Sequence, residues 1–205
     1  MTDTSQHALW NGPAGEAWVD AQRLLDQMFA PLATHLLAAI APGDDLRVLD
    51  VGCGTGAVAL GMAGRLGPDA HVTGVDISAP MIALARERAQ RAGLAVDFIV
   101  ADAQQHAFAP GSLDRIVSRF GVMFFDDPVQ AFGQLQRAAK RGGVLQVLAW
   151  RGASAASTVR IWRRTSRCSD RSGAHCATAT SLRTSEPRCS TRCCRRSSRS
   201  STGIR

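Results

Sequence analysis

The residues best suited to chemistry form a glycine-rich turn at 50–56, Asp-Val-Gly-Cys-Gly-Thr-Gly, between a short apolar run and an amphipathic stretch. Glycines in such a turn let backbone N–H groups come close to a ligand at the start of a helix. The carboxylate of Asp50 would repel a pyrophosphate but attract a cationic or amino-bearing ligand. The turn therefore indicates a ligand site, although glycines also serve many sheets simply to turn a corner.

Short apolar runs alternate with amphipathic stretches through the middle of the chain. The runs at 46–51, 71–76, 95–100, 113–120 and 144–150 are typical of buried strands, with helices expected between them. This alternation favours parallel strands joined by right-handed crossovers. We therefore predict an α/β fold with a doubly wound, Rossmann-like, mostly parallel sheet. Ligands of such sheets bind beyond the carboxyl ends of the strands, where Asp50, Asp76 and Asp102 fall.

The chain divides into three predicted parts. Residues 1–42 have the spacing of helices, one over 15–30 that ends at Pro31 and one over 32–41, and we expect them to form an N-terminal helical lid. Residues 43–152 contain the predicted sheet and form the core. Residues 153–205 form a tail of different composition.

The tail carries the whole basic excess of the protein. Its net charge is +10, whereas residues 1–152 have a net charge of −3, and the chain as a whole has +7. The tail is rich in Arg, Ser and Cys and poor in large apolar residues, so it lacks the surface that a core needs, and we predict it to be disordered. A shifted reading frame through a GC-rich gene would give this composition.

Four segments, taken in order, resemble the motifs of class I S-adenosylmethionine-dependent methyltransferases. Residues 48–56 resemble motif I, 74–78 the second motif and 101–103 the third. Residues 118–125 resemble the segment after strand four in the type-11 branch, which includes the ubiquinone/menaquinone biosynthesis methyltransferases. The resemblance implies that residues 43–152 are an S-adenosylmethionine-binding methyltransferase core.

The resemblance also implies how the cofactor, S-adenosylmethionine, is bound. Asp50 would meet the ammonium group, Asp76 the ribose hydroxyls and Asp102 the adenine amino group, and carboxylates can accept such hydrogen bonds. No metal is implied, and no catalytic residue is assigned. The implied cofactor-binding residues are Asp50, Gly52, Cys53, Gly54, Thr55, Gly56, Asp76, Ile77, Met81, Asp102, Ala103, Ser118, Arg119 and Phe120.

Arg119 has three possible roles at the end of the fourth strand. Its guanidinium could orient an acidic acceptor, bind the carboxylate of the cofactor, or pair with Asp126. The sequence alone leaves these alternatives open.

Two other functions fit parts of the sequence. Residues 54–59 satisfy the dinucleotide pattern G-x-G-x-x-G/A, with Asp76 twenty residues after Gly56, so an NAD-dependent dehydrogenase is an alternative, disfavoured by Asp50 and Asp102. A non-catalytic nucleotide-binding or nucleic-acid-associated protein, with the basic tail as its contact, is the other.

The expected partner is a small-molecule methyl acceptor, and the apolar stretch at 120–125 is compatible with an apolar one. The sequence has no run of eighteen apolar residues and no signal peptide pattern, so we expect a cytoplasmic protein without a membrane span. The family completes its sheet after strand five with an antiparallel pair, which we expect to be missing here. Strand 144–150 would then be an open edge, prone to self-association.

Overall fold

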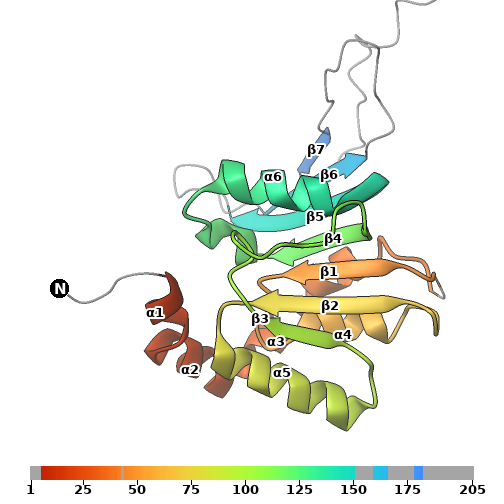
Figure 1. Ribbon diagram of the computed structural model, residues 1–205. Helices are drawn as coiled ribbons and strands as arrows, with labels where there is room; N and C mark the ends of the chain where they lie inside the picture. The colour runs from red at the N-terminus through yellow and green to blue at the C-terminus, as the bar shows by residue number, and fades with distance from the viewer. Residues whose placement is uncertain (1–5, 43, 151–158, 166–177, 182–205) are drawn as a thin grey trace, which may run out of the picture.

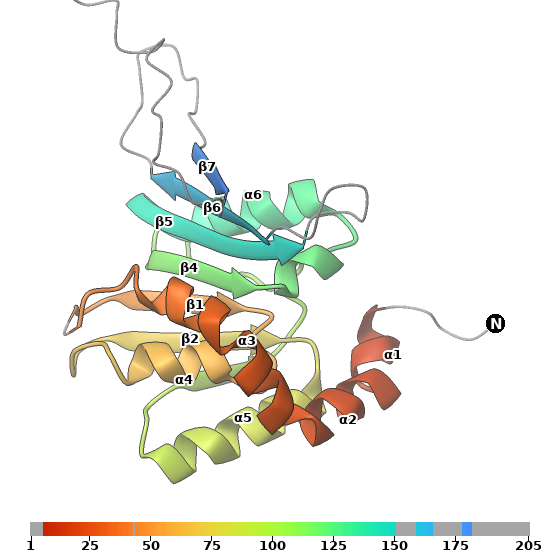
Figure 2. The same cartoon turned by 180° about the vertical axis from the view of Figure 1, so that it is seen from behind.

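A computed structural model describes residues 6–42 and 44–150 and, for the backbone alone, residues 159–165 and 178–181. They form one sheet with helices on both faces (Figures 1 and 2). The helices are α1 (Gln6–Trp10), α2 (Pro13–Asp20), α3 (Gln22–Leu37), α4 (Ala57–Ala63), α5 (Ala79–Ala92), the 3-10 helix η1 (Gly121–Phe124) and α6 (Pro128–Ala138). The strands are β1 (Arg47–Val51), β2 (His71–Asp76), β3 (Asp97–Val100), β4 (Leu113–Arg119), β5 (Ala139–Trp150), β6 (Val159–Thr165) and β7 (Thr178–Ser181).

The sheet has the strand order β3-β2-β1-β4-β5-β6-β7, and its first five strands along the chain are parallel. β1 lies between β2 and β4, so the direction of winding reverses at its carboxyl end. Such a switch point is where open α/β sheets bind ligands. The predicted doubly wound, mostly parallel sheet is confirmed.

Neighbouring residues of β1 point to opposite faces and enter two separate hydrophobic clusters. Val48 packs with Leu36 of α3 and Met62 of α4, in a cluster that also includes α5. Leu49 packs in a second cluster with Leu135 of α6. Because both faces of β1 are covered, the neighbouring residues Val48 and Leu49 are both apolar, rather than one apolar and one polar.

The prediction that Pro31 ends a helix is wrong. α3 runs through Pro31 without interruption, and the chain breaks earlier, at Ala21 between α2 and α3. A proline inside a helix lacks one backbone hydrogen bond. Burial of Phe29, Leu32 and Leu37 against the core offsets that loss and keeps the helix continuous.

The prediction that the closing strands are missing is also wrong. β6 pairs antiparallel with β5 from Val144↔Thr165 to Trp150↔Val159, and β7 pairs with β6. The prediction rested on the average composition of the tail, but residues 159–165 are rich in β-branched and aromatic residues, which favour strands. Pairing with β5 is made by backbone hydrogen bonds, so it does not require an apolar composition. β5 is therefore not an open edge, and the self-association predicted there loses its basis. Residues 153–158, 166–177 and 182–205, where we predict disorder, lie outside the described residues.

The loops that follow β1 and β4 meet backbone to backbone. A Cβ atom added to Gly121 would lie 2.5 Å from the Cα of Gly52 and 2.5 Å from the carbonyl oxygen of Val51. Gly52 also has a φ of +66°, which residues with a side chain rarely adopt. The contact therefore requires glycine on both sides.

We expect Gly121→Ala to lower the free energy of unfolding by about 1–3 kcal/mol, because the added methyl group forces two loops apart. Gly133→Ala is the matched control. A Cβ there would meet only the Arg137 side chain at 3.6 Å, so the helix propensity of alanine should raise stability by about 0.5–1 kcal/mol. Urea unfolding of both variants measures the difference, and equal stabilities would contradict the prediction.

Candidate functional site

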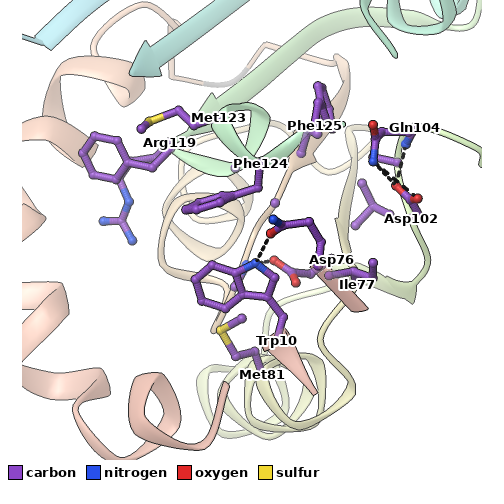
Figure 3. Close-up of a pocket in the computed structure, with 18 of the residues that line it drawn as sticks. Trp10, Asp76, Ile77, Met81, Asp102, Gln104, Arg119, Met123, Phe124 and Phe125 are labelled. Atoms are coloured by element: carbon purple, nitrogen blue, oxygen red, sulfur yellow. Dashed lines mark hydrogen bonds between the residues drawn. The ribbon is translucent and has the colours of Figure 1, made fainter. Parts of the chain in front are cut away.

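A pocket lies between the carboxyl ends of the parallel strands and the N-terminal helices (Figure 3). Apolar side chains form most of its wall: Trp10, Trp18, Phe29, Met81, Phe120, Met123, Phe124, Phe125 and Trp150. The residues expected from the sequence that do line it are Gly52, Gly54, Asp76, Ile77, Met81, Asp102, Ala103, Arg119 and Phe120. The structure thus brings together the ends of β1, β2, β3 and β4 at one site.

Asp76, the last residue of β2, is held by two backbone amides. Its Oδ1 accepts a hydrogen bond from the N–H of Ser78 (2.9 Å) and its Oδ2 accepts one from the N–H of Gly54 (2.8 Å). Burial raises the pKa of Asp76, and these amides oppose the rise. Each oxygen of a carboxylate has two acceptor positions, so Asp76 keeps capacity for two further donors.

Asp102 follows β3 and is oriented by the residues after it. Its Oδ1 accepts a hydrogen bond from the backbone N–H of Gln104 (2.9 Å), and its Oδ2 accepts one from the side-chain amide of Gln105 (3.2 Å). Gln104 also lines the pocket, and its side-chain oxygen accepts the N–H groups of Asp126 and Asp127. The glutamine thereby ties the Asp102 loop to the start of α6.

The glycine turn presents one residue openly to the pocket. Gly54 has a φ of +55°, and a Cβ there would meet only the sulfur of Met81, at 3.7 Å. Gly56 faces elsewhere, because its Cβ would lie 3.0 Å from Phe98 and 3.1 Å from Ala85. Gly54 is thus placed for ligand contact, and Gly56 for packing of the turn on β3 and α5.

A smaller hollow adjoins the pocket; we call it the inner hollow. It shares Trp18, Gly52, Gly54, Arg119 and Phe120 with the pocket and adds Leu25, Asp26, Asp50, Cys53, Thr55 and Val58. Three of the expected residues, Asp50, Cys53 and Thr55, therefore lie at this second space rather than in the main pocket.

Asp50 is a buried carboxylate without a partner. It is 1% exposed, and neither of its oxygens has a hydrogen-bond partner in the described part of the chain. Burial raises its pKa to about 7, and the positive charge of Arg119 opposes the rise. A buried, unpaired carboxylate is costly, and such groups gather at functional sites.

Ser118 is not brought to either space. Its hydroxyl is fully buried, donates to the carbonyl of Val51 (2.7 Å) and accepts the N–H of Val122 (3.2 Å). The side chain therefore joins β1 to η1 and supports the pocket floor without reaching a ligand.

The N-terminal helices are fastened to the turn between β2 and α5. The side chain of Asn11 donates to the carbonyl of Ile77 (3.0 Å) and accepts the N–H of Ala79 (2.8 Å). The Ser78 hydroxyl donates to the carbonyl of Trp10 (2.7 Å) while it caps α5. Sequence reasoning missed Asn11, because nothing in a local pattern links it to residues 66 positions away.

The central part of the chain is similar to known methyltransferases. Residues 48–143 match the family model described as a methyltransferase domain. The demethylmenaquinone methyltransferase of Thermus thermophilus is 42% identical over 102 residues, which are 50% of this chain and 46% of that protein. The ubiquinone/menaquinone biosynthesis C-methyltransferase of Rhizobium meliloti is 38% identical over 117 residues, which are 55% of this chain and 45% of that one.

A solved structure agrees. Phosphoethanolamine N-methyltransferase 2 of Haemonchus contortus, in complex with S-adenosyl-L-methionine, superposes with a TM-score of 0.54 at 31% identity, over 58% of this chain and 28% of that one. The chain spans a little under half the length of the curated relatives that it matches. The resemblance is confirmed over the central part of the chain: residues 48–143 match a methyltransferase domain, and the fold is shared with a methyltransferase solved in complex with S-adenosyl-L-methionine. Both curated relatives named above are quinone-biosynthesis methyltransferases.

Two kinds of feature are absent from the residues that the structure describes. No helix among them is long and apolar enough to span a membrane. No group of three or more His, Cys, Asp or Glu side chains among them could hold a metal ion.

The raised pKa of Asp50 predicts a pH dependence of stability. The unfolded carboxyl loses its proton near pH 3.8, whereas the folded one keeps it up to about pH 7. The folded state thus binds the extra proton between these values, and stability falls as pH rises, by up to about 1.4 kcal/mol per pH unit. Asp50→Asn should remove this decline and be more stable than the parent above pH 7.

Urea unfolding at pH 5, 6, 7 and 8 measures this effect, with the exposed Asp69→Asn as the control. An identical pH profile for the parent and Asp50→Asn would contradict the prediction, whereas Asp69→Asn should match the parent.

Proposed function

We propose that the protein transfers a methyl group from S-adenosylmethionine to a small, apolar organic acceptor. One observation carries the proposal: the carboxylates of Asp76 and Asp102 and the open face of Gly54 line the same pocket, next to the unpaired carboxylate of Asp50. The match of residues 48–143 to a methyltransferase domain supports it.

The donor groups of the site fit this cofactor. Asp76 has free acceptor positions for the ribose diol, and Asp102 lies farther along the pocket for the amino group of the adenine (Figure 3). The backbone at Gly52 and Gly54 is open to the methionine chain, and Asp50 can receive its ammonium group. The three carboxylates are hydrogen-bond acceptors, and they suit a cofactor whose ammonium, hydroxyl and amino groups are hydrogen-bond donors.

When bound, S-adenosylmethionine supplies a methyl group that is open to in-line attack by a nucleophile. The protein then contributes chiefly by holding the acceptor in line with the methyl group, which can substantially lower the activation free energy of the transfer. The aromatic wall excludes water and holds the acceptor against the cofactor site. Among the described residues that line the pocket there is no His, Lys, Tyr or Cys, and Asp76 and Asp102 are held by amide donors. An acceptor that is already nucleophilic suits such a site best.

Calorimetry tests the cofactor directly. We expect the full chain to bind S-adenosylhomocysteine and not NAD, because the carboxylates of Asp50 and Asp76 beside the glycine turn would repel a pyrophosphate. Binding of NAD in preference would establish the dehydrogenase alternative instead.

Asp76→Ala should weaken S-adenosylhomocysteine binding by about 1.5–3 kcal/mol, because charge-assisted hydrogen bonds to two hydroxyls are lost. Titration calorimetry measures the change, and circular dichroism checks the fold. The exposed Asp69→Ala should bind as the parent does. A folded Asp76→Ala variant with unchanged affinity would remove Asp76 from the site.

Gly54→Val should abolish binding, because its side chain enters the space that a ligand would occupy. Gly93→Val is the matched control, since Gly93 has a similar φ of +63° with nothing within 4 Å of its Cβ. Both variants carry the strain of a left-handed backbone. Only the first should lose S-adenosylhomocysteine in a binding assay, and equal binding by both would contradict the assignment.

A further inference from the structure

Gln104 lies between the Asp102 end of the pocket and the loop that carries part of its apolar wall. This loop, residues 121–127 between β4 and α6, contributes three apolar side chains to the pocket, Phe125 among them, and we call it the wall loop. Figure 3 shows Gln104 hydrogen-bonded to Asp102, with Phe125 on the same side of the pocket. One polar side chain therefore borders both regions.

The two ends of the Gln104 amide are used in opposite directions. Its Nε2 donates to both oxygens of the Asp102 carboxylate, at 3.3 and 3.5 Å. Its Oε1 accepts the backbone N–H groups of Asp126 (2.7 Å) and Asp127 (3.1 Å), at the end of the wall loop. Only this orientation satisfies both sides, because the carboxylate needs a donor and the N–H groups need an acceptor. Since the amide is rigid, its two ends turn together.

The hydrogen bonds on the Asp102 side are the long ones, so the empty site holds that end of the amide weakly. The carboxylate has three donors from its own loop: the backbone N–H of Gln104 (2.9 Å), the Gln104 amide and the Gln105 amide (3.2 Å). A carboxylate has about four acceptor positions, so one remains for a ligand. A donor bound there fixes the carboxylate and, through it, the Gln104 amide.

Hydrogen bonding between the Asp102 loop and the wall loop depends on this one side chain. Among the described residues, the hydrogen bonds that join the two loops are those of Gln104 to Asp126 and Asp127. The Gln134 side chain of α6 donates to the Gln104 carbonyl and anchors its backbone. The position of Gln104 is thus set by α6, whereas its amide is left to respond to the carboxylate.

We propose that Gln104 is a positioning residue that couples the two parts of the site: a donor bound at Asp102 fixes the Gln104 amide, and the amide then holds the wall loop in place for the acceptor. The inference rests on the proposed function, in which the donor is the amino group of the cofactor's adenine. Binding of the cofactor thus orders the wall loop before the acceptor arrives. Because such coupling is reciprocal, a bound acceptor also retains the cofactor.

Amide-resolved hydrogen exchange of the full chain measures this coupling. Asp126 and Asp127 are not among the described residues that line the pocket, so a ligand there does not shield their N–H groups directly. We expect saturating S-adenosylhomocysteine to slow the exchange of both amides by roughly three- to tenfold. S-inosylhomocysteine carries a carbonyl oxygen in place of the adenine amino group. It should bind more weakly and, at saturation, leave both exchange rates unchanged.

Two variants separate the two ends of the amide. Gln104→Met removes both, so Asp126 and Asp127 should exchange faster than in the parent, and S-adenosylhomocysteine should no longer slow them. Gln104→Glu keeps an oxygen for the two N–H groups but places a second carboxylate beside Asp102. This variant should keep the protection of the empty parent and lose the further protection on ligand binding. A merely structural role would not separate the two effects.

Gln105→Met is the matched control. The exposed Gln105 side chain donates to the same carboxylate but accepts neither of the two amides, so this variant should keep the protection that depends on the ligand. Gln104→Glu retains the test if Gln104→Met does not fold.

A parent protein that binds S-adenosylhomocysteine without slower exchange at Asp126 and Asp127 would overturn the proposal. Protection by the ligand that persists in Gln104→Met or Gln104→Glu would overturn it as well. These results would leave the proposed function standing, because S-adenosylhomocysteine would still bind. Failure of the parent to bind S-adenosylhomocysteine at all would instead overturn the proposed function, and this inference with it.

Discussion

The close approach of Gly52 and Gly121 is the constraint on which the site depends. It brings the loop after β1 against the loop after β4, so that the glycine turn and Arg119 border the same space. It also forces the chain to turn sharply at Phe120, which has a left-handed φ of 71° although it is not glycine. The Phe120 ring stacks on Trp150 at 5.0 Å, and its N–H donates to the carbonyl of Leu148. This packing holds the strained residue in place.

The polar groups at the strand ends are organised for a ligand rather than for stability. Ser118 satisfies its hydrogen bonds within the protein, as buried polar groups ordinarily do. Asp50 and Arg119 keep buried polar atoms without a hydrogen-bond partner among the described residues, which destabilises the fold. The hydrophobic clusters on the two faces of the sheet offset that loss of stability. Ser118 therefore supports the floor of the pocket, whereas its neighbour Arg119 faces the space above that floor.

Sequence alone could predict the strands, because each is a short apolar run between helical stretches. It could also place the strand-end aspartates at the site, because ligands of parallel sheets bind beyond the carboxyl ends of the strands. A serine before a helical stretch is a common N-cap, and the Ser78 hydroxyl does accept the N–H of Met81 at the start of α5. Sequence reasoning could not tell that Asp50 faces a separate hollow from Asp76, because that depends on how two loops pack. It failed at Pro31 and at β6 for one reason: tertiary contacts and backbone pairing outweighed local composition.

The attachment of α1 to the turn after Asp76 has a kinetic consequence. Asn11 and the carbonyl of Trp10 are hydrogen-bonded to residues 77–79, so α1, which borders the pocket at Trp10, is tied to the turn that follows Asp76. Moving α1 away from the pocket therefore requires these three hydrogen bonds to break, so a molecule held at Asp76 beside Trp10 would leave at a rate limited by that step.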